Sequence, residues 1–204
     1  MISHELRTPL AVIRGAAAVI ALHQDLPSHF AEPLRRIETA TKDMVLALDQ
    51  LLALARENEG VLEEWVALRP MIDNAVSSAE IRYPKGAITV SINIYSGAAV
   101  FIHPTSLQLV INNLVGNCFQ HVGNGELVVE FDGTCLSISD DGPGLETSTD
   151  PWVPFARGDT NIGSGLGLDI SRRLCDAAGI VLTTGGSKGG RGTHFRLTFG
   201  EARS

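Results

Sequence analysis

The apolar residues of this 204-residue chain repeat with one period up to about residue 58 and with other periods after it. In the first stretch they recur at alternating spacings of four and three, the heptad pattern of helices that pack side by side. A break that contains Pro27 separates two such runs, and its length suits a tight antiparallel turn. The sequence therefore predicts a helical hairpin, with seam residues Leu6, Leu10, Ile13, Ala17 and Ile20, then Phe30, Leu34, Ile37, Thr41, Met44, Leu48, Leu51 and Ala55.

A single hairpin cannot bury all of this apolar surface, because Val45 and Leu52 widen the second run beyond one narrow seam. Two hairpins from two chains would bury it as a four-helix bundle. The alternative is a hairpin packed on another domain of its own chain, and we favour the homodimer. Seams of this kind usually extend further toward the N-terminus than His4, so we expect that the chain is a fragment that begins inside its first helix.

After residue 58 the pattern indicates a mixed α and β region. The predicted helices lie at residues 70–82, 104–121 and 164–178, and the predicted strands at 87–95, 98–102, 126–132 and 134–140, followed by two C-terminal strands. Asp132-Gly133 is a hairpin turn signal. Residues 145–163 show little periodicity, which predicts a mobile loop. The expected fold class is α+β, a mixed sheet with helices on one face.

The composition argues against several classes of protein. The formal net charge is −7, from 16 Lys and Arg against 23 Asp and Glu, whereas nucleic-acid-binding proteins carry a basic face. The longest apolar stretch, residues 10–22, contains Arg14 and is too short to span a bilayer, so we expect no membrane contact by this segment. The polar residues soon after Met1 predict no signal peptide. The widely spaced cysteines do not resemble zinc ligands and are expected to be reduced, buried thiols of a cytoplasmic protein: Cys118, Cys135 and Cys175.

The helix expected at residues 104–121 has two faces. Its buried face would consist of Leu107, Val110, Ile111, Leu114 and Cys118. Asn113, Asn117 and His121 follow one another at intervals of four and would share a second face. Amide oxygens suit Mg²⁺, and amide NH₂ groups suit phosphate. A ligand site and a polar, solvated face are both compatible with this spacing.

Two glycine-containing segments extend this candidate ligand site. Asp140 closes a strand, where its carboxylate could accept a hydrogen bond from an exocyclic amine such as that of adenine. Gly142 and Gly144 would let a flat base approach the backbone. Residues 163–168 run straight into a helix, whose free N–H groups and dipole form a phosphate cradle. Each segment alone is explained as well by an ordinary turn, as are the glycines at 189–192 before the last strand.

His4 lies near the start of the first helical run, in the sequence Ser-His-Glu-Leu-Arg-Thr-Pro-Leu. Imidazole is a nucleophile when neutral, and its ordinary pKa leaves it largely neutral at pH 7. On a helix, Thr8 would lie one turn from His4, and Glu5 could accept a hydrogen bond from His4 Nδ1–H, which leaves Nε2 as the nucleophile. Pro9 deprives the carbonyl group of Glu5 of its helical partner and predicts a bend. The alternative is an exposed surface histidine.

In this order, the motifs resemble those of sensor histidine kinases, whose catalytic domain belongs to the Bergerat-fold (GHKL) ATPase superfamily. The first region resembles the family in its H box, residues 3–10. In the second region the matching motifs are the N box at Asn113 and Asn117, the G1 box at 140–144, the F box at 155–157, the G2 box at 163–168 and a last glycine box at 190–193. The resemblance covers almost the whole chain.

The resemblance implies two domains. Residues 1–59 would form an α-helical hairpin for dimerisation and histidine phosphotransfer, which is half of a dimeric four-helix bundle. Residues 60–204 would form the catalytic ATP-binding domain, an α+β sandwich of the Bergerat/GHKL type with an ATP lid at about residues 145–163.

The resemblance also implies roles for individual residues. Catalysis would fall to His4, Glu5, Thr8 and Arg157, of which Arg157 would reach the γ-phosphate. Asn117 would hold Mg²⁺ with support from Asn113, and Asp140 would bind adenine. The full set implied to bind ATP is Asn113, Asn117, Gln120, His121, Asp140, Gly142, Gly144, Phe155, Gly163, Ser164, Gly165, Leu166, Gly167 and Thr193. Many relatives carry Lys and then Tyr or His where this chain has Gln120 and His121, so one positive charge is missing here.

The function implied is that of a histidine kinase core, which autophosphorylates His4 from Mg²⁺-ATP and passes the phosphoryl group to an aspartate of a response-regulator receiver domain. Glu5 and Thr8 would also allow regulator phosphatase activity. The parent protein would be anchored in the bacterial inner membrane. Two alternatives remain: a nucleotide-binding signalling module that acts mainly as phosphatase or scaffold, and another Bergerat ATPase, such as an anti-sigma serine kinase or a chaperone-like ATPase.

Overall fold

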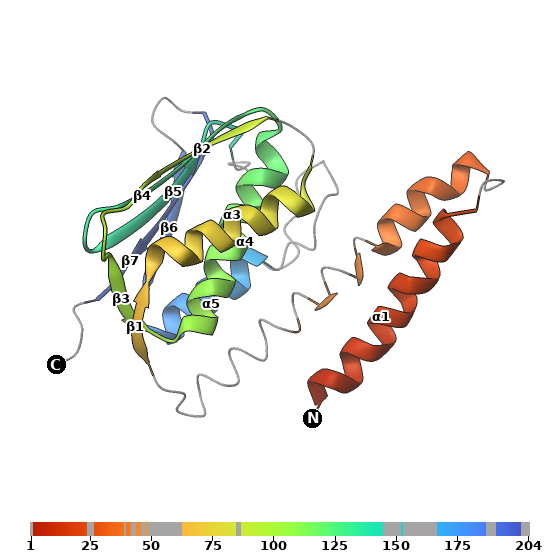
Figure 1. Cartoon of the computed structure of the whole chain (residues 1–204), viewed down its shortest axis with the longest axis horizontal. Coiled ribbons are helices and arrows are strands. Elements are labelled where there is room, and N and C mark those ends of the chain that lie inside the picture. Colours follow the sequence, from red (N-terminus) through yellow and green to blue (C-terminus); the bar gives the residue numbers. More distant parts are fainter. Residues whose placement is uncertain are drawn as a thin grey trace.

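The computed structural model describes residues 2–23, 27–38, 40–41, 44–45, 48, 63–84, 87–144, 152, 167–186 and 191–200. The first region is helical, as predicted. Helix α1 (Ile2–Ala21) continues through Pro9, and the 3₁₀ turn η1 (Ser28–Phe30) leads into a second helical segment at residues 31–38, 40–41, 44–45 and 48. Figure 1 shows the two helical segments in red and orange, joined at one end as a hairpin.

The hairpin leaves much of its seam uncovered. Among its described side chains, Ala17, Leu34 and Thr41 are buried. Large apolar side chains of the same region are exposed: Val12, Ile13, Val19, Ile20, Leu22, Phe30, Ile37 and Met44. This exposure agrees with the argument that one hairpin cannot bury its own apolar surface, although the homodimer itself stays a prediction.

The second region contains two sheets. Strands β1 (Glu64–Ala67) and β3 (Ala99–Ile102) form an antiparallel pair. A five-stranded sheet has the order β2-β4-β5-β7-β6. In it β2 (Ile88–Asn93) runs parallel to β4 (Gly125–Phe131), while β5 (Cys135–Asp140), β7 (Thr193–Thr198) and β6 (Val181–Gly186) complete it with antiparallel pairings. The mixed sheet is thus confirmed, whereas β1 is a strand that the sequence did not predict.

Three helices cover one face of this sheet (Figure 1). They are α3 (Leu68–Arg82), α4 (Pro104–Val122) and α5 (Gly167–Ala177). Their positions agree with the predicted helices, although residues 164–166 of the predicted third helix lie outside the described residues. None of the described helices combines the length and the apolar character needed to cross a membrane.

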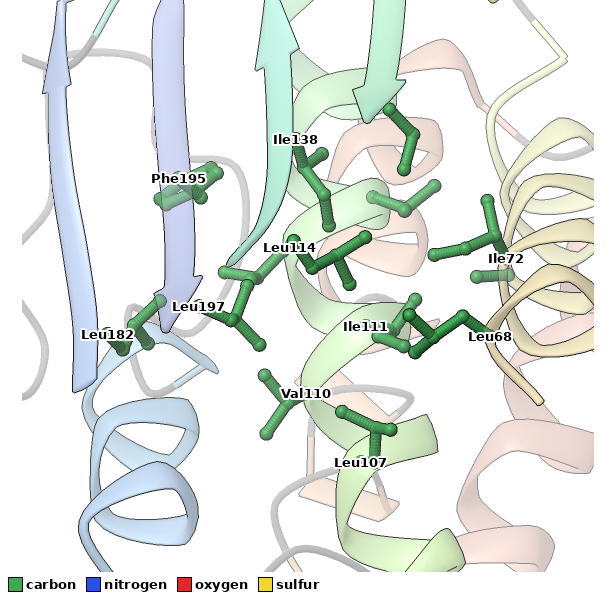
Figure 2. Close-up of a cluster of buried hydrophobic side chains, with 14 of the residues drawn as sticks. Leu68, Ile72, Leu107, Val110, Ile111, Leu114, Ile138, Leu182, Phe195 and Leu197 are labelled. Atoms are coloured by element: carbon green, nitrogen blue, oxygen red, sulfur yellow. The ribbon is translucent and has the colours of Figure 1, made fainter. Parts of the chain in front are cut away.

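Helix α4 is the centre of the core. Its predicted buried face is confirmed, with Leu107, Val110, Ile111, Leu114 and Cys118 all buried. Figure 2 shows Ile111 and Leu114 of α4 between Leu68 and Ile72 of α3 and the sheet side chains Ile138, Phe195 and Leu197. His103 caps the helix, because its Nδ1 accepts a hydrogen bond from the backbone N–H of Ser106 at 3.3 Å, and Pro104 begins the first turn. The polar face of α4 is therefore carried on a firmly packed element.

Candidate functional site

Asp140 is the last residue of β5, and its side chain is only 4% exposed. Its Oδ1 atom accepts hydrogen bonds from the backbone N–H of Gly142 at 2.9 Å and of Thr193 at 3.1 Å. A carboxylate that is removed from water needs such donors, and hydrogen bonds to a charged acceptor are stronger than neutral ones. Both bonds use Oδ1, so they orient the carboxylate and leave Oδ2 outside this pair of backbone contacts.

Glycines are required around Asp140 because the backbone passes very close to it. A Cβ atom at Gly142 would lie 3.0 Å from Asp140 Oδ1 and 3.2 Å from the Cα of Val122. Gly192 has φ +79°, and a Cβ there would collide with the carbonyl oxygen of Asp140. Gly144, at φ +84°, would bring a Cβ to 3.1 Å from the Gly192 carbonyl oxygen. The G1 segment and the last glycine box, 50 residues apart in sequence, therefore meet at Asp140.

Cys118 and His121, both on α4, are electrostatic neighbours of Asp140. Burial raises the pKa of the Cys118 thiol well above its ordinary value, and the charge of Asp140 and a hydrogen bond with it raise this pKa further. Desolvation lowers the pKa of His121, and the attraction of Asp140 offsets part of that effect. At pH 7 the thiol is protonated and the imidazole is neutral, so neither side chain brings a positive charge to Asp140.

Asn113 connects α4 to the start of α5. Its Nδ2 atom donates to the carbonyl oxygen of Gly167 at 3.1 Å and to Oγ of Ser171 at 3.0 Å. A Cβ at Gly167 would lie 3.4 Å from Asn113 Oδ1, so the two elements also approach closely here. Asn113 thus holds the N-terminal turn of α5, the end of a helix that favours anions.

Asn117 and Gln120 follow Asn113 on the same side of α4. The hydroxyl group of Tyr83 donates to Gln120 Oε1 at 3.1 Å. Asn117 is half-buried, and within the described part of the chain no group is hydrogen-bonded to its side-chain amide. The members of the predicted ridge, Asn113, Asn117 and His121, therefore differ, because Asn113 is bound to α5 while the Asn117 amide can take a ligand. Gln120, which lies outside that predicted ridge, is bound to Tyr83.

The other predicted site residues are located as follows. Thr193 is buried beside Asp140, to which its backbone N–H donates. His4 and Glu5 lie on α1, and Thr8 on the same helix is exposed. The predictions that fall outside the described residues concern Phe155, Arg157, Gly163, Ser164, Gly165 and Leu166, together with most of the expected lid.

Trp152 is the described residue of the expected lid. Its side chain is half-buried and packs against the hydrophobic core, with the guanidinium group of Arg172 from α5 5.6 Å from its ring centroid. Such a distance is typical of a cation–π contact. Sequence reasoning missed this partner of Trp152, and it also missed Tyr83 and the contact of Cys118 with Asp140. No local signal in the sequence joins residues that are 20 to 37 positions apart.

Two family models match this chain. The "Histidine kinase-, DNA gyrase B-, and HSP90-like ATPase" family matches residues 102–203, and the "His Kinase A (phospho-acceptor) domain" matches residues 1–60. The chain belongs to the sensor histidine kinases. The His Kinase A match covers the helical region, and the ATPase match lies within the second region, where it contains Asp140, the glycines around it and helix α4.

Curated relatives agree with this membership. "Probable sensor histidine kinase TcrY" of Mycobacterium tuberculosis is 32% identical over 205 residues, covering 92% of this chain and 42% of TcrY. "Sensor protein QseC" of Salmonella typhi is 28% identical over 201 residues, covering 92% of this chain and 44% of QseC. The chain thus spans less than half the length of these relatives.

Solved structures show the same fold. The histidine kinase AdeS of Acinetobacter baumannii is similar at a TM-score of 0.62 and 20% identity, with 96% of each chain covered. Full-length ShkA in complex with AMPPNP is similar at a TM-score of 0.63 and 22% identity, covering 98% of this chain and 46% of ShkA.

Proposed function

We propose that this chain binds Mg²⁺-ATP in its second region and transfers the γ-phosphoryl group to His4. The observation that carries the proposal is the Asp140 cluster, in which a buried carboxylate is oriented by two backbone N–H groups and surrounded by obligatory glycines. Asp140 would accept a hydrogen bond from the adenine amine, and the glycines beside it would let the base approach the backbone. The ShkA structure, which has the same fold, contains AMPPNP.

The triphosphate would extend from Asp140 toward Asn117 and the start of α5. Asn113 holds this helix end in place, and the helix dipole favours phosphate there. Arg157 would neutralise charge that develops on the γ-phosphoryl group during transfer.

The residues of the site fit a magnesium ion that arrives with the nucleotide. The described residues contain no group of three or more His, Cys, Asp or Glu side chains arranged to hold a metal. An amide oxygen is a hard ligand that Mg²⁺ accepts beside water and phosphate oxygens, so Asn117 would be its protein ligand. When bound, the ion would neutralise phosphate charge and orient the triphosphate.

The acceptor would be His4 on α1. Its Nε2 atom would form a bond with the γ-phosphorus while the bond from this phosphorus to the β–γ bridging oxygen breaks, which leaves ADP and phosphohistidine. Glu5 would hold the proton on Nδ1 so that Nε2 keeps its lone pair. The phosphoryl group would then pass to an aspartate of a receiver domain. Transfer to His4 within one chain and transfer between two protomers are both compatible with this chemistry.

The hairpin would supply the dimer interface. Ile13, Ile20 and Met44 are exposed on it at 48%, 46% and 59%, and a second hairpin would cover such side chains in a four-helix bundle. Since the curated relatives are longer sensor proteins, we further propose that the segment works in the cytoplasm as part of a parent protein anchored in the bacterial inner membrane.

A second function, a signalling module that binds nucleotide and acts mainly as a phosphatase or scaffold, is favoured by one observation. Gln120 is neutral where many relatives carry Lys, and its oxygen is engaged by Tyr83. Dephosphorylation of a regulator without autophosphorylation would support this function.

The test of the kinase proposal is incubation of the whole chain with γ-labelled ATP and Mg²⁺. The wild type should gain label that is stable in alkali and labile in acid. His4→Ala should gain none, whereas His23→Ala, a matched change of an exposed histidine in the same hairpin, should label normally. Label on serine would instead support another Bergerat ATPase, and nucleotide binding without any label would support the signalling module.

A further inference from the structure

Ser171 is a buried polar residue of α5 that lies outside the nucleotide-binding motifs described above. The residue is 0% exposed, and the other buried residues of this helix are Ile170, Leu174 and Cys175. Burial of a hydroxyl group is unfavourable without a hydrogen bond. The Ser171 oxygen accepts one from Asn113 Nδ2 at 3.0 Å. The polar contact of Ser171 is therefore made with a residue of the candidate site.

Asn113 uses both hydrogens of its amide within the protein. Its Nδ2 atom donates to the Gly167 carbonyl oxygen at 3.1 Å as well as to Ser171, and a carboxamide has only these two hydrogens to donate. The carbonyl group of Gly167 can only accept, so the nitrogen end of the amide must face it. Asn113 is half-buried, and no donor among the described residues is hydrogen-bonded to its Oδ1. The side chain therefore offers a ligand an acceptor and no donor.

The oxygen end of this amide lies at the first residue of α5. A Cβ at Gly167 would be 3.4 Å from Asn113 Oδ1, so the amide fills the side-chain space of the residue that begins the helix. In the proposed site the triphosphate extends to the same helix end. Asn113 Oδ1 is therefore at the phosphate end of that site.

An acceptor in this place discriminates between two forms of a nucleotide. Phosphate oxygens are also acceptors, so Asn113 Oδ1 repels a phosphate group that carries no metal ion. A magnesium ion attracts the amide oxygen, either as a direct ligand or through one of the water molecules that Mg²⁺ usually keeps. With a free amide hydrogen Asn113 would lack this preference, because it could donate to phosphate directly.

We propose that Ser171 is a positioning residue that makes Asn113 selective for the magnesium-bound nucleotide: by accepting the second amide hydrogen, its hydroxyl oxygen leaves Asn113 only an acceptor to present. The inference rests on the proposed ATP site and adds to it a residue and a preference for one form of the ligand. Ser171 acts through Asn113 and does not itself contact the nucleotide.

Titration calorimetry of the whole chain with AMPPNP, in excess Mg²⁺ and in EDTA, tests this role. The ratio of the two affinities measures the preference for the metal-bound form. In Ser171→Ala one amide hydrogen is released and the amide oxygen is held less firmly toward the ion. Binding of Mg²⁺-AMPPNP should therefore weaken, while binding of metal-free AMPPNP should stay the same or strengthen. The ratio should fall about threefold to tenfold, the size expected for one neutral hydrogen bond.

Ser106→Ala is the matched control. Ser106 is another buried helical serine, 2% exposed, whose hydroxyl oxygen lies 3.4 Å from His103 Nδ1 in the first turn of α4. This variant should keep the wild-type ratio. Adenosine has no phosphates, so Ser171→Ala should bind it as the wild type does. If Ser171→Ala does not fold, Ser171→Cys, which puts a weaker acceptor in the same place, should lower the ratio in the same direction.

The outcomes are distinguishable. A lower ratio with normal adenosine binding would support the role of Ser171. An unchanged ratio, equal losses in Mg²⁺ and in EDTA, or a loss of adenosine binding in a folded variant would overturn that role and leave the ATP site in place. A wild type that binds AMPPNP equally well with and without Mg²⁺ would likewise overturn only this inference. Failure of the wild type to bind Mg²⁺-AMPPNP would overturn the proposed function itself and this inference with it.

Discussion

Replacing Gly192 with alanine should damage the second region far more than the same replacement at Gly97. The two residues have similar positive φ angles, +79° and +84°, so both variants incur the strain of an alanine at positive φ, about 1–2 kcal/mol. A Cβ at Gly97 would have no atom within 4 Å. At Gly192 the new atom would collide with the Asp140 carbonyl oxygen and lie 2.9 Å from the Cα of Asp141.

The additional cost at Gly192 follows from what must move. The obstructing atoms belong to the backbone, so a side-chain rotation cannot relieve the collision, and the start of β7 must separate from the end of β5. That separation breaks the bond from the Thr193 N–H to Asp140, and a hydrogen bond to a charged group contributes about 1.5–3 kcal/mol. Together with the strain, Gly192→Ala should lose about 2.5–5 kcal/mol of unfolding free energy.

Urea unfolding monitored by tryptophan fluorescence will measure this difference. The two tryptophans, Trp65 and Trp152, both lie in the second region, so the signal does not report on the helical hairpin. Gly97→Ala serves as the control, with an expected loss of about 1–2 kcal/mol. Equal losses in the two variants would refute the reasoning, because they would mean that Gly192 is required for its conformation alone and not for contact with Asp140.

Three further predictions follow from the site. Asn113→Ala should lower the unfolding free energy by about 1–3 kcal/mol through the loss of two hydrogen bonds to α5, whereas Asn117→Ala should leave stability unchanged and weaken Mg²⁺-nucleotide binding in calorimetry. The Cys118 thiol should resist a disulfide reagent at pH 8 in the native chain and react in urea, because burial and the neighbouring Asp140 raise its pKa. Arg172→Ala should shift the emission of Trp152, measured in a Trp65→Phe background, toward that of an exposed indole, since the cation above the ring is lost.

The sequence predicted best the elements that have a long and regular apolar pattern. The residues expected inside α4 are all buried, since a 19-residue helix offers five turns over which its period can be read. Strand β1 escaped prediction because it has four residues and only Val66 among them is buried. A strand this short exists through its pairing with β3, and a pairing of residues about 35 positions apart leaves no local pattern.

In the candidate site, too, local spacing predicted which residues share a face, but tertiary contacts decide their roles. Helical spacing showed that Asn113 and Asn117 share a face, but it gave the two residues equal roles. Their difference comes from tertiary contacts. Gly167 and Ser171 of α5 accept hydrogen bonds from Asn113, whereas no described group is hydrogen-bonded to the Asn117 amide. Likewise, Asp140 was recognised as the end of a strand, but the register of β5 against β7 decides that the N–H of Thr193 completes its environment.

The charges in this region explain why the anchoring of α5 matters for a phosphate ligand. Asp140 is an acid, the Cys118 thiol stays protonated because its pKa is raised, and the lowered pKa of His121 leaves its imidazole neutral at pH 7. Gln120 is neutral where many relatives carry a lysine, and its oxygen accepts a hydrogen bond from Tyr83. In the proposed site, attraction for phosphate would therefore come from the helix end, from the magnesium ion and from Arg157. The attraction of a helix dipole for an anion falls off within the first turn of the helix, so the position of that turn matters. Asn113 fixes the first turn of α5 through two hydrogen bonds. We therefore expect Asn113 to control how strongly the α5 N-terminus attracts phosphate, since Asp140, Cys118, His121 and Gln120 supply no positive charge.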